Sequence, residues 1–232
     1  MMKLSIIIPV FNEEKTISQM LEKINRLDVD NVIKQVIIVN DGSTDRTKNE
    51  IENFVKNHSE VKSVTHAKNQ GKGAAIRTGI ETATGEYVVI QDADLEYDPQ
   101  DYYNLIKPII DNKTKVVYGS RLLNPNFKQG YSLNLFATKL LSFLSNLLYN
   151  AKITDEPTCY KVFRTEVIRS INLKCKKFEF CPEVTAKVRK KGYKIYEVPI
   201  NYYPRSIAEG KKINWKDGVE AIWTLVKYRF ID

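Results

Sequence analysis

The sequence has few of the residues that build zinc sites, disulfide frameworks or flexible linkers. Its 232 residues include three cysteines, Cys159, Cys175 and Cys181, whose spacing matches no zinc-binding pattern. An odd number of cysteines argues against a disulfide scaffold and favours reduced thiols, as in a cytoplasmic protein. The two histidines, His58 and His66, are assigned no role. Ten glycines and eight prolines are too few for a fibrous or disordered chain, so the composition predicts an ordinary globular protein.

Long hydrophobic runs are also missing. No stretch approaches the about 18 consecutive apolar residues that a membrane-spanning helix requires. The short apolar run 4–10 contains Pro9 and is followed by Glu13 and Glu14, so it lacks the length and the flanks of a signal peptide. We interpret this run as a strand. We expect a cytoplasmic protein that does not span a membrane but can lie peripherally on its inner face.

Acidic residues are outnumbered by basic ones. The chain has 36 Lys and Arg against 28 Asp and Glu, which gives a formal net charge of +8 at pH 7. This surplus favours anionic partners, namely phosphates, anionic lipid head groups or nucleic acid. Charge alone does not choose among these three classes of partner.

In the first half of the chain, apolar runs alternate with amphipathic stretches. The apolar runs are continuous and rich in β-branched residues, which is typical of strands buried on both faces. This alternation predicts an α/β fold with a mainly parallel central sheet flanked by helices, and the length favours a single domain with a C-terminal extension. The expected strands are 4–10, 36–39, 61–65, 87–90 and 116–119, and the expected helices are 14–27, 44–57 and 74–83.

The second half contains one long amphipathic helix, predicted over about 132–150. Two interpretations stay open: a helix packed in the core, or a helix that lies partly in a bilayer surface or lines an apolar acceptor groove. We also expect a short helix over 182–191, a strand over 195–199, a polar loop over 205–212 and a terminal helix from about Trp215. The long helix carries apolar residues at the spacing of one face, namely Leu133, Phe136, Ala137, Leu140, Leu141, Leu144, Leu147 and Leu148, widened by Leu135 and Phe143.

Acidic clusters directly follow three of the predicted strands. They are Phe11-Asn12-Glu13, Asn40-Asp41-Gly42-Ser43 and Asp92-Ala93-Asp94, with Glu96 two residues after the last. Because ligands of such sheets bind at the carboxyl ends of the strands, these clusters mark one edge as the candidate site. Carboxylates at this density suit Mg²⁺ or Mn²⁺, which bind through one or two carboxylates together with substrate phosphates and water. A solvated acidic turn is the alternative interpretation of Asp92 and Asp94.

A glycine-bearing turn, Asn69-Gln70-Gly71-Lys72-Gly73-Ala74-Ala75, precedes a predicted helix. Free backbone N–H groups and the helix dipole attract anions at such a place, so Gly71 and Lys72 are candidates for nucleotide binding. The P-loop spacing is not satisfied, and Ile76 stands where a dinucleotide fingerprint needs its third glycine. The turn can also serve simply to begin a helix.

Taken in order, these segments resemble family 2 glycosyltransferases of the GT-A fold, a Rossmann-like architecture. Within that family, the resemblance is to dolichyl- and polyprenyl-phosphate mannosyl- and glucosyltransferases. It is carried by Ser5 to Glu14, Val39 to Asp45, Asn69 to Ala75 and Gln91 to Leu95, and it continues through Tyr118 to Arg121, Thr154 to Lys161 and Pro204-Arg205-Ser206 with Lys211. The resemblance therefore spans most of the chain. It implies one domain over 1–232, with a nucleotide-sugar-binding half (1–120) and an acceptor half (121–232) that ends in an amphipathic helix.

The resemblance also implies roles for individual residues. It implies that Pro9, Phe11, Glu13 and Asp41 form the base and ribose pocket, that Asp92 and Asp94 hold metal and nucleotide, and that Glu96 matches a further metal-contacting position. It implies that Arg205 and Lys211 close over the donor diphosphate and that Arg121 lies near an acceptor phosphate. The chain departs from the common pattern at Asn40 and Glu96, and both departures leave the identity of the donor open.

The implied reaction is an inverting, metal-dependent hexosyl transfer from a nucleotide sugar of the GDP-mannose or UDP-glucose type to a polyprenyl or dolichyl phosphate. Asp155 is the candidate base; the alternative is that it only caps the turn before Pro157. A sugar hydroxyl needs such a base, whereas a phosphate monoester with a second pKa of about 6 is mostly ionised already. Transfer to a saccharide hydroxyl in polysaccharide synthesis stays open, and a non-catalytic nucleic-acid-binding module is a remote alternative because acids line the predicted edge.

Overall fold

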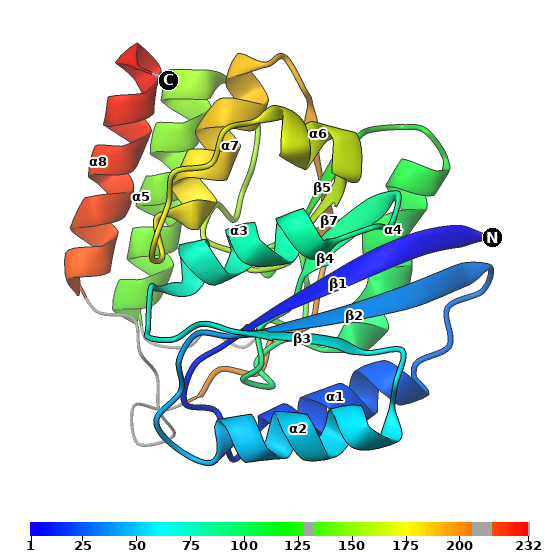
Figure 1. Cartoon of the computed structure of the whole chain (residues 1–232). Helices are drawn as coiled ribbons and strands as arrows, with labels where there is room; N and C mark the ends of the chain where they lie inside the picture. The colour runs from blue at the N-terminus through cyan, green and yellow to red at the C-terminus, as the bar shows by residue number, and fades with distance from the viewer. Residues whose placement is uncertain (128–131, 206–214, 232) are drawn as a thin grey trace.

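A computed structural model describes residues 1–127, 132–205 and 215–231 of the chain (Figure 1). Within these residues seven strands form one sheet in the order β3-β2-β1-β4-β6-β5-β7. Only β6 runs antiparallel to its neighbours, β4 and β5, so the expectation of a mainly parallel sheet is confirmed. The strands are β1 (Met2–Val10), β2 (Val32–Asn40), β3 (Lys62–Thr65), β4 (Tyr87–Ile90), β5 (Val116–Ser120), β6 (Lys161–Arg164) and β7 (Ile195–Pro199).

Helices cover both faces of the sheet. In Figure 1, α1 and α2 lie on one side of β1 and β2, and α3 lies on the other side with α6 and α7. On the first side, Tyr103 at the start of α4 donates a hydrogen bond to the carbonyl of Asp28 just after α1. The helices are α1 (Ile17–Arg26), α2 (Thr47–Asn57), α3 (Lys72–Thr82), the 3₁₀ turn η1 (Pro99–Asp101), α4 (Tyr102–Ile110), α5 (Ser132–Tyr149), α6 (Thr165–Ser170), α7 (Phe180–Lys190) and α8 (Trp215–Phe230).

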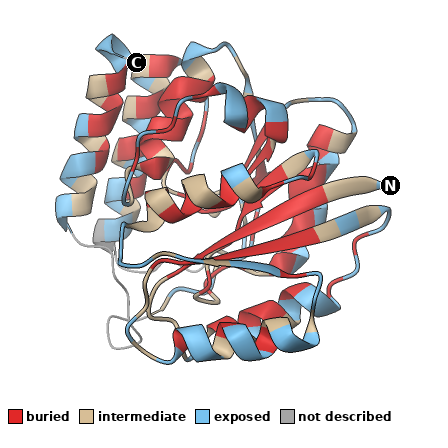
Figure 2. Ribbon diagram, in the orientation of Figure 1, coloured by how far each residue is buried: buried red, intermediate tan, exposed pale blue. Residues whose placement is uncertain are grey.

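The central strand β1 explains why its apolar run is unbroken. Ile6, Ile7 and Ile8 are all fully buried, because β1 lies between β2 and β4 and has helices on both faces (Figure 2). Pro9 is tolerated there because the pairing of β1 with β4 ends two residues earlier, at Ile7 and Ile90. A missing backbone N–H therefore breaks no ladder bond on that side.

A second core lies between α5, α7 and α8. Leu141 and Tyr149 of α5 pack there with Ala221, Leu225 and Tyr228 of α8. The apolar face predicted for α5 is therefore divided: Leu141, Leu144 and Leu148 face this core, whereas Phe136, Phe143 and Leu147 are exposed. No helix within the described parts of the chain combines the length and the hydrophobicity needed to cross a bilayer.

The structure contains elements that the sequence did not lead us to predict, namely η1, α4, the four-residue strand β6 and α6. The loop expected over 205–212 lies, after Arg205, outside the described residues. The basic cluster 187–191 is not wholly exposed to solvent: Lys187 is buried, and its Nζ lies 2.5 Å from Glu183 Oε1. The spacing of α7 turns Lys187 toward the same side as Glu183, one helical turn earlier.

Candidate active site

The carboxyl ends of β2, β1 and β4 lie side by side, as the sequence predicted. These three strands are neighbours in the sheet, and Val10 of β1 pairs with Asn40 of β2. The acidic segments that follow them, around Glu13, Asp41 and Asp92, therefore share one edge, which we call the acidic edge. Parallel strand order alone brings these segments together.

Asp92 lies against a lysine from the start of α3. The Nζ atom of Lys72 is 2.5 Å from Asp92 Oδ1, and the sulfur of Cys159 is 4.0 Å from the same ammonium. Burial alone would lower the pKa of Lys72, but the Asp92 carboxylate raises it well above its ordinary value. A permanently charged lysine thus neutralises the first carboxylate of the acidic edge.

Asp94 lies against an arginine from near the other end of the chain. Arg205 Nη2 is 3.0 Å from Asp94 Oδ2, and Arg205 Nη1 is 3.2 Å from Glu13 Oε2. Burial, followed by the charges of Asp92 and Glu96, raises the pKa of Asp94 to about 7, although Arg205 acts in the opposite direction. Burial and the two neighbouring carboxylates therefore disfavour the charged form of Asp94 more than Arg205 stabilises it.

Glu96 holds the segment that carries Arg205. Its Oε1 accepts a hydrogen bond from the backbone N–H of Arg205 at 2.8 Å, and its Oε2 accepts one from the Tyr202 hydroxyl at 2.9 Å. Leu95, between the two acidic residues, adopts a left-handed φ of 64°, which a non-glycine residue keeps only when its surroundings impose it. Glu96 thus holds the backbone at Arg205 in place, and the metal contact that the resemblance implies for Glu96 stays a prediction.

The donor atoms at this edge fit a hard divalent cation. Asp92 and Asp94 offer carboxylate oxygens at the end of one strand, and a cation bound there would stabilise the charged form of Asp94, which burial and the neighbouring carboxylates disfavour. No three Asp, Glu, His or Cys side chains among the described residues form a complete metal cage. A cation held here therefore needs oxygens from a substrate as well, as Mg²⁺ commonly does.

Asp41 is committed to the glycine-bearing turn instead of the open edge. Its carboxylate accepts hydrogen bonds from the backbone N–H groups of Gln70, at 2.9 Å, and Gly71, at 2.7 Å, and it contacts His66 Nδ1 at 2.7 Å. His66 is also bonded to Thr78 Oγ1, so it is a satisfied structural histidine, consistent with the absence of an assigned role. Asp41 fixes the loop from which Lys72 reaches Asp92.

Four backbone N–H groups of the glycine-bearing turn, which we expected to be free, are already bonded within the protein. Gly73 and Ala74 donate to the carbonyls of Lys177 and Lys176, and Gly71 donates to Asp41. Gly71 has a φ of 97°, and a Cβ on it would lie 2.3 Å from the Lys176 carbonyl oxygen. Glycine is therefore required by the close approach of two loops, and the charge of Lys72 remains as the feature of this turn that can attract an anion.

Arg121 and Asp155, which the sequence placed in separate roles, form one ion pair. Asp155 Oδ2 accepts hydrogen bonds from the backbone N–H and Nε of Arg121, and Arg121 Nη2 is 2.7 Å from Asp155 Oδ1. Asp155 has no exposed side-chain surface, whereas Arg121 keeps 14% of its own. The Tyr202 ring lies 4.9 Å from the guanidinium.

Of the remaining site candidates, the structure describes Pro9 and Phe11 but not Lys211. Pro9 is buried in β1, where its side chain supports the edge, and Phe11 directly after the strand is half-buried. Lys211 lies outside the described residues. Sequence reasoning missed Tyr202, which contacts both Arg121 and Glu96; its position three residues before Arg205 was the one available signal.

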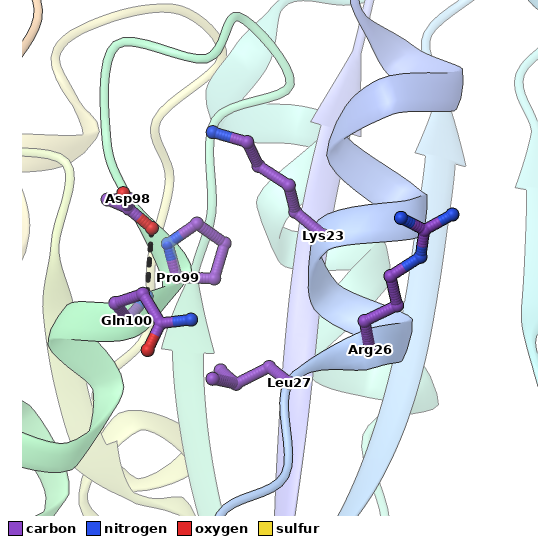
Figure 3. Close-up of a pocket in the computed structure, with 6 residues that line it drawn as sticks. All are labelled: Lys23, Arg26, Leu27, Asp98, Pro99 and Gln100. Atoms are coloured by element: carbon purple, nitrogen blue, oxygen red, sulfur yellow. Dashed lines mark hydrogen bonds between the residues drawn. The ribbon is translucent and has the colours of Figure 1, made fainter.

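A separate pocket lies away from these groups. It has a volume of about 280 Å³ and lies between the last turn of α1 and η1 (Figure 3). Asp98 and Gln100 on one wall are joined by a hydrogen bond from the Gln100 N–H to the Asp98 carboxylate at 3.0 Å. A helix of ten residues spans about 15 Å, so Lys23 and Arg26 are far from Glu13, which precedes α1. The other lining residues are Leu27 and Pro99.

Comparisons with known proteins agree on one family. The sequence model of the family described as "Glycosyl transferase family 2" matches residues 5–171. The chain is 31% identical to a UDP-N-acetylglucosamine–dolichyl-phosphate N-acetylglucosaminyltransferase of Methanococcus voltae, over 90% of this chain and 89% of that protein. It is 27% identical to a dodecaprenyl-phosphate galacturonate synthase of Rhizobium johnstonii, over 81% of this chain but only 55% of that longer protein.

Solved structures share the fold. The whole chain superposes on 81% of the UDP complex of glucosyl-3-phosphoglycerate synthase from Mycobacterium tuberculosis, with a TM-score of 0.77 and 20% identity. The complex of the same enzyme with Mn²⁺ and UDP-glucose gives a TM-score of 0.73 at 19% identity, over 100% of this chain and 80% of that one. The similarity in structure confirms the expected GT-A-like architecture.

Proposed function

Because this chain belongs to glycosyl transferase family 2, we propose that it transfers a hexose-type sugar from a nucleotide diphosphate to a polyprenyl phosphate, with inversion at the anomeric carbon. The names of the relatives in Methanococcus voltae and Rhizobium johnstonii, a dolichyl-phosphate and a dodecaprenyl-phosphate enzyme, support this class of acceptor. The observation that carries the proposal is the pairing of Asp92 with Lys72 and of Asp94 with Arg205 at the acidic edge.

On the donor side, the nucleotide lies over residues 1–120, with Pro9, Phe11 and Glu13 forming the base and ribose pocket. Asp41 acts there by holding the loop of Gly71. Lys72 and Arg205 exchange part of their contact with carboxylates for contact with the diphosphate. Two fixed cations beside the leaving group stabilise the negative charge that grows as the glycosidic bond breaks.

A divalent cation completes the donor site in this proposal. Asp92 and Asp94 would hold Mg²⁺ or Mn²⁺ together with the diphosphate, and the structural neighbours crystallised with Mn²⁺ support this choice. The ion supplies Lewis-acid stabilisation of the leaving diphosphate. Glu96 contributes by keeping Arg205 beside Asp94, and Lys211 is proposed to join Arg205 at the diphosphate.

On the acceptor side, Arg121 binds the phosphate of the lipid. Its guanidinium lies beside the ring of Tyr202, and the Tyr202 hydroxyl donates a hydrogen bond to Glu96. Two contacts therefore connect the cation that binds the lipid phosphate with the residues that bind the nucleotide sugar. A phosphate monoester with a second pKa of about 6 is mostly dianionic at neutral pH. It can attack the anomeric carbon without first losing a proton to the protein.

The lipid acceptor requires contact with a membrane surface, and α5 and α8 offer a suitable face. These two helices pack together and expose large apolar side chains in helical register, with basic residues beside them. Aromatic residues flanked by cations are typical of segments that lie at a membrane interface with anionic lipids. The apolar side chains that are at least 60% exposed are Phe136, Phe143, Leu147, Trp215, Trp223 and Phe230.

The direct test is transfer of labelled sugar into an organic phase. The full chain is incubated with Mn²⁺, a polyprenyl monophosphate and labelled GDP-mannose, UDP-glucose or UDP-N-acetylglucosamine in turn. We expect label in the lipid phase with at least one donor, because Arg121 selects a phosphate and Lys72 and Arg205 select a diphosphate. The same mixture with a saccharide in place of the lipid tests the alternative acceptor.

The control for this experiment is the variant Asp92→Asn/Asp94→Asn, which keeps the shape of the site and removes both charges. It should leave the lipid phase unlabelled. Label that enters a saccharide with every active donor and never the lipid would overturn the proposed acceptor. Salt-sensitive binding to nucleic acid that survives the double substitution would favour the non-catalytic alternative.

A further inference from the structure

We propose that Asp155 is a positioning residue, which aims Arg121 at the acceptor phosphate and takes no proton itself. The inference deepens the proposed function and rests on it for the identity of the acceptor. It assigns to Asp155 a task different from the base that the family resemblance implies. Four features of the structure support it: the burial of Asp155, its hydrogen bonds, its backbone support and the free edge of Arg121.

Both oxygens of Asp155 are already engaged. Oδ2 accepts from the backbone N–H of Arg121 at 2.9 Å and from Nε at 2.8 Å, and Oδ1 accepts from Nη2 at 2.7 Å. The side chain of Asp155 has no accessible surface. A general base must come within hydrogen-bond distance of the proton that it removes, and a carboxylate enclosed in this way does not reach a substrate.

The backbone on both sides of the ion pair is held in place. Glu197 of β7 accepts hydrogen bonds from the backbone N–H groups of Thr154 and Asp155, at 2.8 and 3.1 Å. The Arg121 N–H is bonded to Asp155 itself, so the guanidinium and its own backbone are tied to the same carboxylate. A bidentate pair fixes both the direction and the plane of the guanidinium, which a single contact does not do.

The pairing leaves one edge of Arg121 available. Asp155 takes the edge formed by Nε and Nη2, the Tyr202 ring lies 4.9 Å away, and no hydrogen bond to Nη1 occurs among the described residues. Burial alone would lower the pKa of Arg121, but Asp155 raises it well above its ordinary value. The exposed 14% of this side chain therefore belongs to a permanent cation with unused N–H donors.

This geometry suits a phosphate acceptor. An ionised phosphate requires a cation that holds one of its oxygens toward the anomeric carbon, whereas a hydroxyl acceptor requires a proton acceptor. On the acceptor side, Arg121 is the oriented cation. Both oxygens of Asp155 are occupied in orienting it, so Asp155 is not available as a proton acceptor.

The test is a double-mutant cycle of Asp155→Asn and Arg121→Gln in the full chain. Steady-state kinetics use Mn²⁺, the active labelled donor and a short-chain prenyl monophosphate between pH 5.5 and 8.5. For Asp155→Asn we expect KM for the prenyl phosphate to rise about tenfold or more, since a charge-assisted bidentate contact is lost. The maximal kcat should stay within about tenfold and its pH profile should keep its shape.

The double variant Asp155→Asn/Arg121→Gln leaves no buried charge of this ion pair unpaired, because it replaces both members together. If Asp155 acts only through Arg121, the double variant resembles Arg121→Gln, with no further loss of kcat. If Asp155 is a base, kcat falls by a further 10²- to 10⁴-fold, roughly, and the acidic limb of the pH profile disappears. That result overturns the inference and leaves the proposed lipid acceptor intact. A wild-type enzyme that transfers nothing to prenyl phosphate overturns both.

Discussion

The carboxylates of the acidic edge and the carboxylate of Asp155 differ in how far they are buried and in how completely they are paired with cations. At the acidic edge, Asp92 and Asp94 each keep 17% of their side-chain surface, and each contacts a cation through one carboxylate oxygen. On the acceptor side, Asp155 is fully enclosed and bonded through both oxygens. The first arrangement can exchange partners, whereas the second is already ordered.

The difference reflects what each side has to bind. A diphosphate with its cation brings both signs of charge, so the residues that receive it must be able to separate from one another. A phosphate monoester brings one sign only, and a cation oriented in advance binds it at a smaller entropic cost. The predictions below alter one side or the other, beginning with the largest expected effect.

Removing the carboxylates of the acidic edge should have the greatest effect. For Asp92→Asn/Asp94→Asn we expect kcat/KM to fall by about 10³-fold or more, because the groups that hold the cation supply several kcal/mol of transition-state stabilisation. Thermal unfolding should be unaltered or shifted upward, since the variant removes the charge of Asp94, which burial and then the charges of Asp92 and Glu96 disfavour. The matched control is Glu52→Gln, an exposed carboxylate of α2, which should retain full activity. An active double variant would contradict the assignment of the donor site.

Glu156, the neighbour of Asp155 in sequence, differs from it in having one carboxylate oxygen without a hydrogen-bond partner among the described residues. Glu156 is fully buried and its Oε2 has no hydrogen-bond partner within the described residues. Burial raises its pKa from 4.5 to about 7, against the opposing charge of Lys161. The folded protein therefore keeps a proton that the unfolded chain releases earlier, so the stability present below pH 4.5 is lost as the pH rises through 7.

The variant Glu156→Gln removes this titration. The difference in unfolding free energy between the variant and the wild type should grow in favour of the variant by up to about 3 kcal/mol between pH 4.5 and pH 8. Urea unfolding at the two pH values measures it, and Glu52→Gln should show no such pH dependence. A difference that is equal at both pH values would show that folding does not raise the pKa of Glu156.

Lys72 tests whether the acidic edge exchanges its cations. In Lys72→Met, kcat/KM for the donor should fall about 10²-fold, since one cation beside the leaving group is lost. The same variant should bind Mn²⁺ alone more tightly than the wild type, because the ammonium no longer competes for Asp92; electron paramagnetic resonance of free Mn²⁺ measures this. Weaker Mn²⁺ binding would mean that Lys72 and the metal do not share Asp92.

The exposed face of α5 and α8 should affect membrane binding without affecting the core. For Phe143→Ser/Trp223→Ser we expect about a tenfold loss of binding to vesicles that contain anionic lipid, from the apolar area withdrawn from the interface. Flotation measures the bound fraction, and Ile33→Ser, which alters a half-exposed residue of β2, is the control. A variant that floats normally but changes the oligomeric state would identify this face as an interface between two copies of the chain.

The parallel half of the sheet was predictable because its signals are local. Each of β1, β2 and β4 contains an unbroken apolar run close to its carboxyl end, followed by polar residues, so the place where each strand ends is visible in a few neighbouring residues. The strand β6 was missed because its sequence has only two apolar residues between Lys161 and Arg164, and its place between β4 and β5 depends on strands that are distant in sequence. The divided face of α5 was ambiguous because only the position of α8 decides which leucines are covered.

In the candidate site too, some features were visible in local sequence and others depended on contacts between distant segments. The sequence by itself determined the family, the parallel sheet and the acidic residues at its edge, because parallel strands that follow one another through helices end at the same edge of the sheet. Only the tertiary structure decided which charges meet: Arg205 reaches Glu13 across 192 positions, and Arg121 reaches Asp155 across 34. Such pairs depend on how loops that are distant in sequence are placed relative to one another. The folded chain brings their charged groups within bonding distance and buries them, and no local sequence pattern indicates which groups will meet.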